Sequence, residues 1–161
     1  EWAGVTPDVM AIAKGLGGGF PVGACLATER AAVGMTAGTH GSTFGGNPLA
    51  MAVANTVLEL MLADGFLANV RSTGDALISR MEGLAKQWPK IIESVRGVGM
   101  LIGLKCAVSA GDMVTACREA GLLTVPAGDN VCRLLPPLII DDSHVSEAVE
   151  MVGIACKALS S

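Results

Sequence analysis

The chain has 161 residues, of which 51% are hydrophobic and 16% are charged, with a formal net charge of −4. This length can bury a sizeable core in one ordinary domain or two small lobes, and this composition excludes a disordered tail. The negative charge balance excludes a polyanion as the main partner, because binding to a phosphate backbone needs a basic face. We therefore expect a folded chain with no nucleic-acid partner.

The cysteines and histidines lack the spacing of a metal site or a disulfide framework. Five cysteines are present, and no two of them form a C-x-x-C pair. This pattern is typical of small buried apolar residues in a reducing compartment. The most apolar stretch, Leu49 to Ala63, is shorter than the roughly 20 residues of a membrane span, and no signal segment opens the chain. We expect a cytoplasmic protein with no metal and no membrane partner.

The first part of the chain, residues 1 to 46, is rich in glycine and shows little helical periodicity. Thr6-Pro7-Asp8 predicts a short helix through Ile12, because proline suits the first helical turn and the threonine can cap it. That helix would place Lys14 at its end. Val22 to Thr28 is the best strand candidate in this part.

Two longer helices are expected next. Asn47-Pro48 places an asparagine cap and a first-turn proline before a helix that should run to about Asp64. Apolar residues surround this helix almost completely, so it should be buried on most sides. The second helix ends at Pro89 and carries apolar residues at three- and four-residue steps, namely Val70, Leu77, Met81, Leu84 and Trp88.

The remaining residues predict a compact two-layer α/β lobe with the order β-α-β-β-α. The last helix begins after a cap at Asp141 or Asp142. A boundary near Pro89 would therefore divide the chain into residues 1–89 and residues 90–161. The expected elements are a strand at Val98–Lys105, a helix at Asp112–Ala120, strands at Leu122–Val125 and Val131–Leu135, and a helix at Ser143–Leu159.

Lys14 precedes the glycine run Gly15-Leu16-Gly17-Gly18-Gly19, where the lack of side chains lets something approach the backbone closely. A nucleotide phosphate loop needs its lysine after the glycines, and a dinucleotide fingerprint needs glycine where Phe20 or Val22 stands. Both sites are excluded. A lysine beside bare backbone instead suits an amine that bonds covalently to a flat aldehyde cofactor. On these residues alone, a solvated surface lysine beside a flexible turn is the simpler interpretation.

Four motifs follow one another along the chain. The first two, residues 13–24 (AKGLGGGFPVGA) and residues 38–50 (GTHGSTFGGNPLA), resemble the lysine motif and a second motif of the class III aminotransferases. Residues 96–100 (RGVGM) and 130–138 (NVCRLLPPL) are similar to two more, in the family's order. The resemblance covers essentially the whole chain. It implies the α/β fold of the fold type I pyridoxal-phosphate-dependent transferases, with the end of the large cofactor domain at 1–89 and the small carboxy-terminal domain at 90–161.

The resemblance also implies roles for individual residues. Lys14 would carry pyridoxal 5'-phosphate and act as the catalytic base, and Thr43 would bond the cofactor phosphate. Ser42 matches a position that contacts the substrate, and Arg133 would take a substrate carboxylate through its forked guanidinium. In the family, the loop that holds Ser42 and Thr43 crosses a dimer interface, which implies a homodimer.

The residues themselves leave alternatives open for two of these roles. Ser42-Thr43 also fits a polar turn before the Asn47 cap. Arg133 lies within an apolar strand, where an unpaired charge is unfavourable and needs a carboxylate partner. That partner would be a substrate carboxylate by resemblance, or Asp129 or Asp141 in a purely structural ion pair.

The activity implied by the resemblance is transfer of an amino group from N-acetylornithine to 2-oxoglutarate, in arginine synthesis. Ornithine, succinylornithine or 4-aminobutyrate as the amino donor stays open, and so does a non-catalytic α/β interaction module. The family's aspartate that pairs with the pyridine nitrogen and its aromatic that stacks on the ring precede the lysine motif, and no residue here matches them. We therefore expect a carboxy-terminal fragment that is inactive alone.

Overall fold

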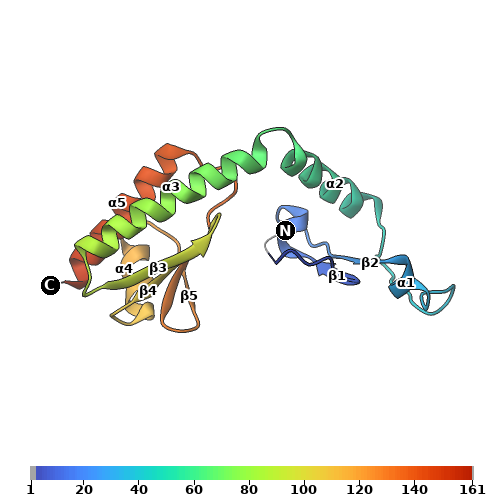
Figure 1. Ribbon diagram of the computed structural model, residues 1–161, viewed down its shortest axis with the longest axis horizontal. Helices are drawn as coiled ribbons and strands as arrows, with labels where there is room; N and C mark the ends of the chain where they lie inside the picture. The colour runs from blue at the N-terminus through green and yellow to red at the C-terminus, as the bar shows by residue number, and fades with distance from the viewer. Residues whose placement is uncertain (1–2, 161) are drawn as a thin grey trace. The chain divides into compact units, whose positions relative to one another are not determined.

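The computed structural model describes residues 3–160 and divides into two compact units, one ending at Phe66 and one beginning at Leu67 (Figure 1). Each unit is described by itself. The division lies at the start of a long helix, so all of that helix except its first residue, Phe66, belongs to the second unit. The expected boundary near Pro89 concerns the domains of a whole enzyme and stays a prediction.

The first unit contains a two-stranded antiparallel sheet, in which β1 (Val9–Ile12) pairs with β2 (Ala24–Ala27). Between the strands lies the 3-10 turn η1 (Lys14–Gly17), and β2 is followed by the short helix α1 (Glu29–Ala32). The helix expected from Thr6 to Ile12 is wrong. Its residues form β1, because cross-strand pairing with β2 outweighs the local helix-start signal in a segment that ends in apolar, strand-favouring residues.

Helix α2 (Pro48–Leu62) begins as expected, since the Asn47 side chain accepts a hydrogen bond from the Ala50 N–H at 2.9 Å. The expectation of burial on most sides is wrong for this unit, where only Ala50 and Ala54 of the helix are buried. Leu62 is 74% exposed. Within residues 3–160, no single helix is long and apolar enough to cross a membrane. Only α2 and the next helix, Phe66–Gln87, reach that length and apolar composition, and they do so together as a pair with a bend between them.

The second unit begins with α3 (Phe66–Gln87), the longest helix, followed by a four-stranded antiparallel sheet with the order β3-β4-β6-β5. Its further elements are β3 (Ile92–Val98), β4 (Leu101–Cys106), α4 (Ala110–Glu119), β5 (Val125–Ala127), β6 (Val131–Leu134) and α5 (Asp142–Leu159). The order is therefore β-β-α-β-β-α after α3. The Asp141 cap of α5 is confirmed, because its carboxylate accepts from the Ser143 N–H at 3.0 Å.

The single strand expected at Val98–Lys105 is wrong, because a turn splits this region into the hairpin of β3 and β4. Gly99 supplies the turn with a φ of 57°, in the left-handed region that glycine adopts most readily. The strand expected at Leu122–Val125 also lies later, at Val125–Ala127. There, Val125 pairs with Arg133 of β6.

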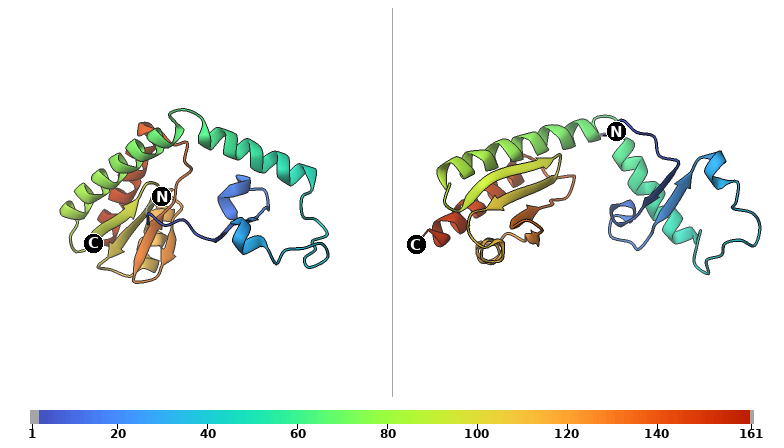
Figure 2. Two further views of the ribbon diagram at one scale, coloured as in Figure 1. Left: turned by 45° about the vertical axis from the view of Figure 1, so that its right-hand side comes forward. Right: turned by 60° about the horizontal axis from the view of Figure 1, so that its bottom comes forward.

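The core of the second unit lies between one face of the sheet and the three helices α3, α4 and α5 (Figure 2). Alternate residues of β4, Ile102 and Leu104, are fully buried on this face, as period-two alternation requires. The helices contribute fully buried side chains to the same cluster, namely Leu77 and Met81 from α3, Met113 and Cys117 from α4, and Val145 and Val152 from α5. The opposite face of the sheet carries the partly exposed residues considered below.

Two glycines of α3 should respond to alanine substitution in opposite directions. A Cβ on Gly74 would lie 2.6 Å from the backbone oxygen of Gly99, whereas a Cβ on Gly83 would meet no atom within 4 Å. Gly74→Ala should destabilise the chain by about 1–3 kcal/mol through overpacking, and Gly83→Ala should stabilise it by about 0.5–1 kcal/mol through helix propensity. Urea denaturation of the 161-residue chain and both variants measures the two free energies of unfolding. Equal effects of the same sign would contradict the packing of α3 on the β3–β4 turn.

Candidate functional site

Lys14 lies at the end of β1, at the first position of the turn η1, and its side chain is exposed. Its backbone φ is 55°, a left-handed conformation that is uncommon for a residue with a side chain. Such strain costs about 1–3 kcal/mol and persists most often at functional positions. The lysine lines a hollow of about 300 Å³ with Ala11, Ile12 and Ala13. A lysine amine is therefore held beside open space by a backbone that is locally unfavourable.

The glycine run after Lys14 has a packing reason within the chain itself. A Cβ on Gly17 would lie 2.7 Å from the Val22 side chain, and one on Gly18 would lie 3.1 Å from Val57 of α2. Gly18 also has a φ of 55°. Two valine side chains of the chain itself thus approach these two glycines. A Cβ on Gly15, in contrast, would meet nothing within 4 Å. The open side of the turn is the side next to Lys14.

Ser42 and Thr43 lie in an exposed loop that leads into α2. The loop is tied to the helix by Asn47, whose Nδ2 donates to the Phe44 carbonyl at 2.9 Å while its Oδ1 caps α2. Ser42 packs against Gly45, where a Cβ would lie 2.9 Å from the Ser42 Cβ. The local geometry is therefore that of a polar turn before the helix cap. These hydrogen bonds do not themselves indicate a contact with a cofactor or substrate.

Arg133 lies on β6, where it pairs with Gly103 of β4 on one side and with Val125 of β5 on the other. Its Nε is buried and has no hydrogen-bond partner among residues 3–160. The structural ion pairs considered for it are not formed, because Asp129 bonds Lys105 and Arg96, and Asp141 caps α5. A half-buried guanidinium with an unsatisfied N–H is a strong attractant for a carboxylate.

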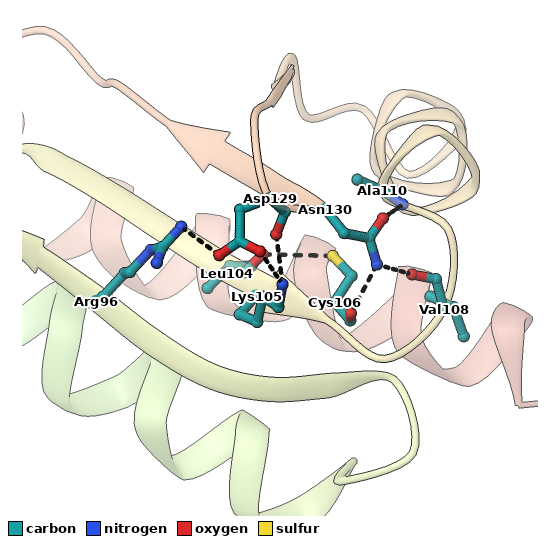
Figure 3. A network of polar contacts seen from close by, with 8 residues as sticks. All are labelled: Arg96, Leu104, Lys105, Cys106, Val108, Ala110, Asp129 and Asn130. Carbon is teal, nitrogen blue, oxygen red and sulfur yellow. Dashed lines mark hydrogen bonds and ion pairs between the residues drawn. The ribbon is translucent and has the colours of Figure 1, made fainter.

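The turn between β5 and β6 joins the neighbouring strands through a polar network (Figure 3). Asp129 and Asn130 both have positive φ, 62° and 53°. Lys105 donates from Nζ to the Asp129 carboxylate and to its carbonyl, at 2.6 Å each, and Arg96 donates to the same carboxylate at 3.2 Å. The hydrogen bond and charge of Lys105, with the charge of Arg96, lower the pKa of Asp129. The carboxylate therefore stays ionised at neutral pH.

Asn130 ties the same turn to the loop between β4 and α4 (Figure 3). Its Nδ2 donates to the carbonyls of Cys106 and Val108, at 2.8 Å and 2.7 Å, and its Oδ1 accepts from the Ala110 N–H at 2.8 Å. The last bond satisfies an N–H at the start of α4, which has no partner within the helix. These bonds fix the position of the start of β6, and hence of Arg133, along β4.

Four of the five cysteines lie in the apolar core of the second unit. Cys106, Cys117, Cys132 and Cys156 are buried and unpaired, and the structure shows no cluster of metal-ligating side chains among residues 3–160. Burial raises the pKa of Cys156 to about 11, and a hydrogen bond with Cys132, together with burial, raises the pKa of Cys117 strongly. Buried residues of this kind serve packing, as expected, whereas Cys25 is exposed.

The candidate residues are divided between the two units. Lys14, Ser42 and Thr43 belong to the first unit, whose turn η1 and loop both adjoin α2, while Arg133 belongs to the second unit. The neighbours of Arg133 on the sheet were not predicted from the sequence, because they come from β3 and β4 and only strand pairing brings them beside β6. Ser94, Arg96 and Val98 of β3 pair with Lys105, Gly103 and Leu101 of β4.

The lysine-bearing turn and the two-layer carboxy-terminal unit together define the class of protein. The family described as aminotransferase class-III matches residues 1–155, so the chain belongs to the class III aminotransferases. Their fold type I α/β architecture and their cofactor, pyridoxal phosphate, are confirmed as the expected ones.

The chain is similar to individual members of this family. The acetylornithine aminotransferase of Mesorhizobium japonicum is 54% identical over 160 residues, which is 99% of this chain and 40% of that protein. The acetylornithine aminotransferase structure from Elizabethkingia anophelis is 33% identical with a TM-score of 0.87, over 96% of this chain and 42% of that one. An ornithine aminotransferase structure from Plasmodium yoelii is 31% identical with a TM-score of 0.86, over 96% and 42%. The chain thus spans about two fifths of these relatives, as their carboxy-terminal part.

Removing the Asn130 side chain tests the network that holds β6. Asn130→Ala should lower the free energy of unfolding by about 1–3 kcal/mol, because donors and acceptors near the start of α4 lose their partners. Asn130→Gly loses the same bonds but accepts the positive φ, so its loss should be smaller. Urea denaturation of the 161-residue chain measures both. A glycine variant as stable as the parent would show that the hydrogen bonds contribute nothing and only the backbone conformation matters.

Proposed function

We propose that the enzyme containing this chain transfers an amino group from N-acetylornithine to 2-oxoglutarate. The observation that carries the proposal is the strained, exposed Lys14 beside open space within the family's lysine motif. The names of the most similar curated relatives support acetylornithine over other amino donors, at 52–54% identity for the first two. A role in arginine synthesis follows from that donor.

The residues present fit pyridoxal phosphate at this position. Lys14 offers an amine without a polar partner among residues 3–160, beside a hollow and beside the open Gly15. Thr43 offers a hydroxyl and a backbone N–H on an exposed loop, which is the donor pair that a phosphate group accepts. The cofactor, when bound, supplies an electron sink for the carbon that loses its proton.

The roles of the chain's own residues follow from their chemistry. Lys14 Nζ, as a free amine, would take the proton from the substrate carbon that bears the amino group. Its tether, a turn packed against α2, limits where that proton can be delivered. Arg133 holds a substrate carboxylate through its unsatisfied N–H and so orients the reacting end. Ser42 contacts the substrate from the same loop as Thr43.

We further propose that the enzyme is a cytoplasmic homodimer. In each subunit, residues 1–89 would form the end of the large cofactor domain and residues 90–161 the small domain. The loop with Ser42 and Thr43 is exposed and precedes a capped helix, so it can be presented to a partner subunit. In a symmetric dimer each subunit would give the contact that it receives.

Borohydride reduction tests the lysine assignment directly. We expect the purified enzyme to show the visible absorbance of bound pyridoxal phosphate, and reduction followed by peptide mapping should place a pyridoxyl group on Lys14. Lys90→Ala, a change at another exposed lysine, should leave labelling unaltered, whereas Lys14→Ala should abolish it. A label on any other lysine would reject the assignment. Absence of any cofactor absorbance would favour a non-catalytic interaction module.

Arg133→Lys tests carboxylate recognition in the same enzyme. The lysine keeps the charge but loses the forked geometry, so kcat/KM for both carboxylate substrates should fall roughly fivefold to 150-fold, which corresponds to about 1–3 kcal/mol. Arg118→Lys, an exposed position on α4, should leave kcat/KM unchanged. Cofactor absorbance should stay normal in both variants. A fall in melting temperature with unaltered kcat/KM would show that Arg133 is structural.

A further inference from the structure

The left-handed backbone of Lys14 needs contacts that prevent it from relaxing. Its φ of 55° is uncommon for a residue with a side chain. Such a conformation persists only when the surrounding structure over-determines it. On the amino-terminal side, Ile12 is held in place two residues before the lysine, because it pairs with Ala24 of β2. A second fixed point is needed on the carboxy-terminal side of Lys14.

Gly18 is that second fixed point, because it packs against Val57 of α2. Helix α2 lies against η1, and a Cβ on Gly18 would lie 3.1 Å from the Cγ2 of Val57. Ala54 and Ala50 precede Val57 by three and seven residues, which places all three on one side of the helix, and both alanines are buried. Val57 therefore belongs to the covered side of α2, where only a residue without a side chain fits against it.

A short run of backbone hydrogen bonds connects Gly18 to Lys14. The Leu16 N–H donates to the Ala13 carbonyl at 3.3 Å. The Gly18 N–H donates to the Gly15 carbonyl at 3.1 Å, so η1 is a closed 3-10 turn. Because the turn is closed, Gly18 can move toward α2 only if backbone angles within the turn change. Among the four residues of η1, Lys14 is the one with a positive φ, and it gains most from such a change.

We propose that Val57 is a positioning residue for Lys14. It keeps Gly18 in place, and thereby keeps the lysine backbone left-handed and the amine beside its hollow of about 300 Å³. The inference rests on the proposed role of Lys14 and adds a residue of α2 that acts through the turn. Without the Val57 side chain, the turn moves into the vacated space and Lys14 relaxes to a negative φ. This rotation redirects the Cα–Cβ bond of the lysine, so its amine spends less time at the position where it reacts.

Kinetics and cofactor labelling of the purified whole enzyme test this role. In Val57→Ala, kcat should fall about tenfold while KM for N-acetylornithine changes less than about twofold, because release of a strained backbone displaces the amine and leaves the substrate contacts intact. A second readout is the rate at which pyridoxal phosphate, added to the cofactor-free enzyme, becomes fixable to Lys14 by borohydride, and it should fall by about the same factor. Val57→Ile keeps the Cγ2 atom and should restore both. Val33→Ala removes the same atoms from a side chain that is 79% exposed and should change neither.

A substitution on the other side of the contact separates positioning from a general loss of stability. Gly18→Ala places a methyl group against Val57 and should also lower kcat. Val57→Ala makes room for that methyl group, so kcat of the double variant should fall by less than the product of the two single effects.

Four outcomes would overturn the inference. Parent-like kcat and labelling rate in Val57→Ala, a change in KM alone, no recovery in Val57→Ile, or fully multiplicative effects in the double variant would each reject it. If Val57→Ala alone fails to fold, parent-like kcat in Gly18→Ala would reject it. A parent enzyme whose Lys14 takes no label removes the proposed function itself. Normal labelling of the parent with an unaffected Val57→Ala removes only the role of Val57.

Discussion

The hydrogen-bond register of β4 with its two neighbours is the constraint on which the second unit depends. Because side chains alternate along a strand, this register decides at once which residues enter the core and which face outward. It places Ile102 and Leu104 in the core and Gly103 and Lys105 on the open face. A slip of one residue would bury Lys105 and expose Leu104. The apolar cluster under the helices therefore specifies the position of the charged residues above it.

Among residues 3–160, three residues with side chains adopt left-handed backbone conformations, and each lies where the chain changes direction sharply. Asp129 and Asn130 turn the chain between β5 and β6, and their strain is offset by hydrogen bonds to Lys105, Cys106, Val108 and Ala110. Asparagine and aspartate tolerate this conformation better than other residues do. Lys14 has no such compensation among residues 3–160. Strain that local contacts do not offset is the feature that most clearly separates Lys14 from an ordinary surface lysine.

The two arginine-bearing strands differ in how readily their chemistry could be recognised. Arg133 stands out in the sequence, because a charged residue interrupts an apolar run before two prolines. Arg96 lies between valine and glycine in a segment that also reads as a loop, and its partner Gly103 has no side chain to draw attention. Only the pairing of three strands brings these residues together on one face. Residues that strand pairing brings together in this way form no contiguous motif.

The sequence by itself determined the four longer helices, α2 to α5, and the family. Asn47, Pro48 and Asp141 are local signals whose partners lie within a few residues. The first residues of α2 and α5 therefore follow from short-range interactions. The lysine motif and the three motifs after it are equally local, which is why they indicated class III aminotransferases. Tertiary structure decided β1, the β3–β4 hairpin and the surroundings of Arg133. These depend on pairing between residues far apart in the chain, and local propensity cannot encode which strand lies beside which.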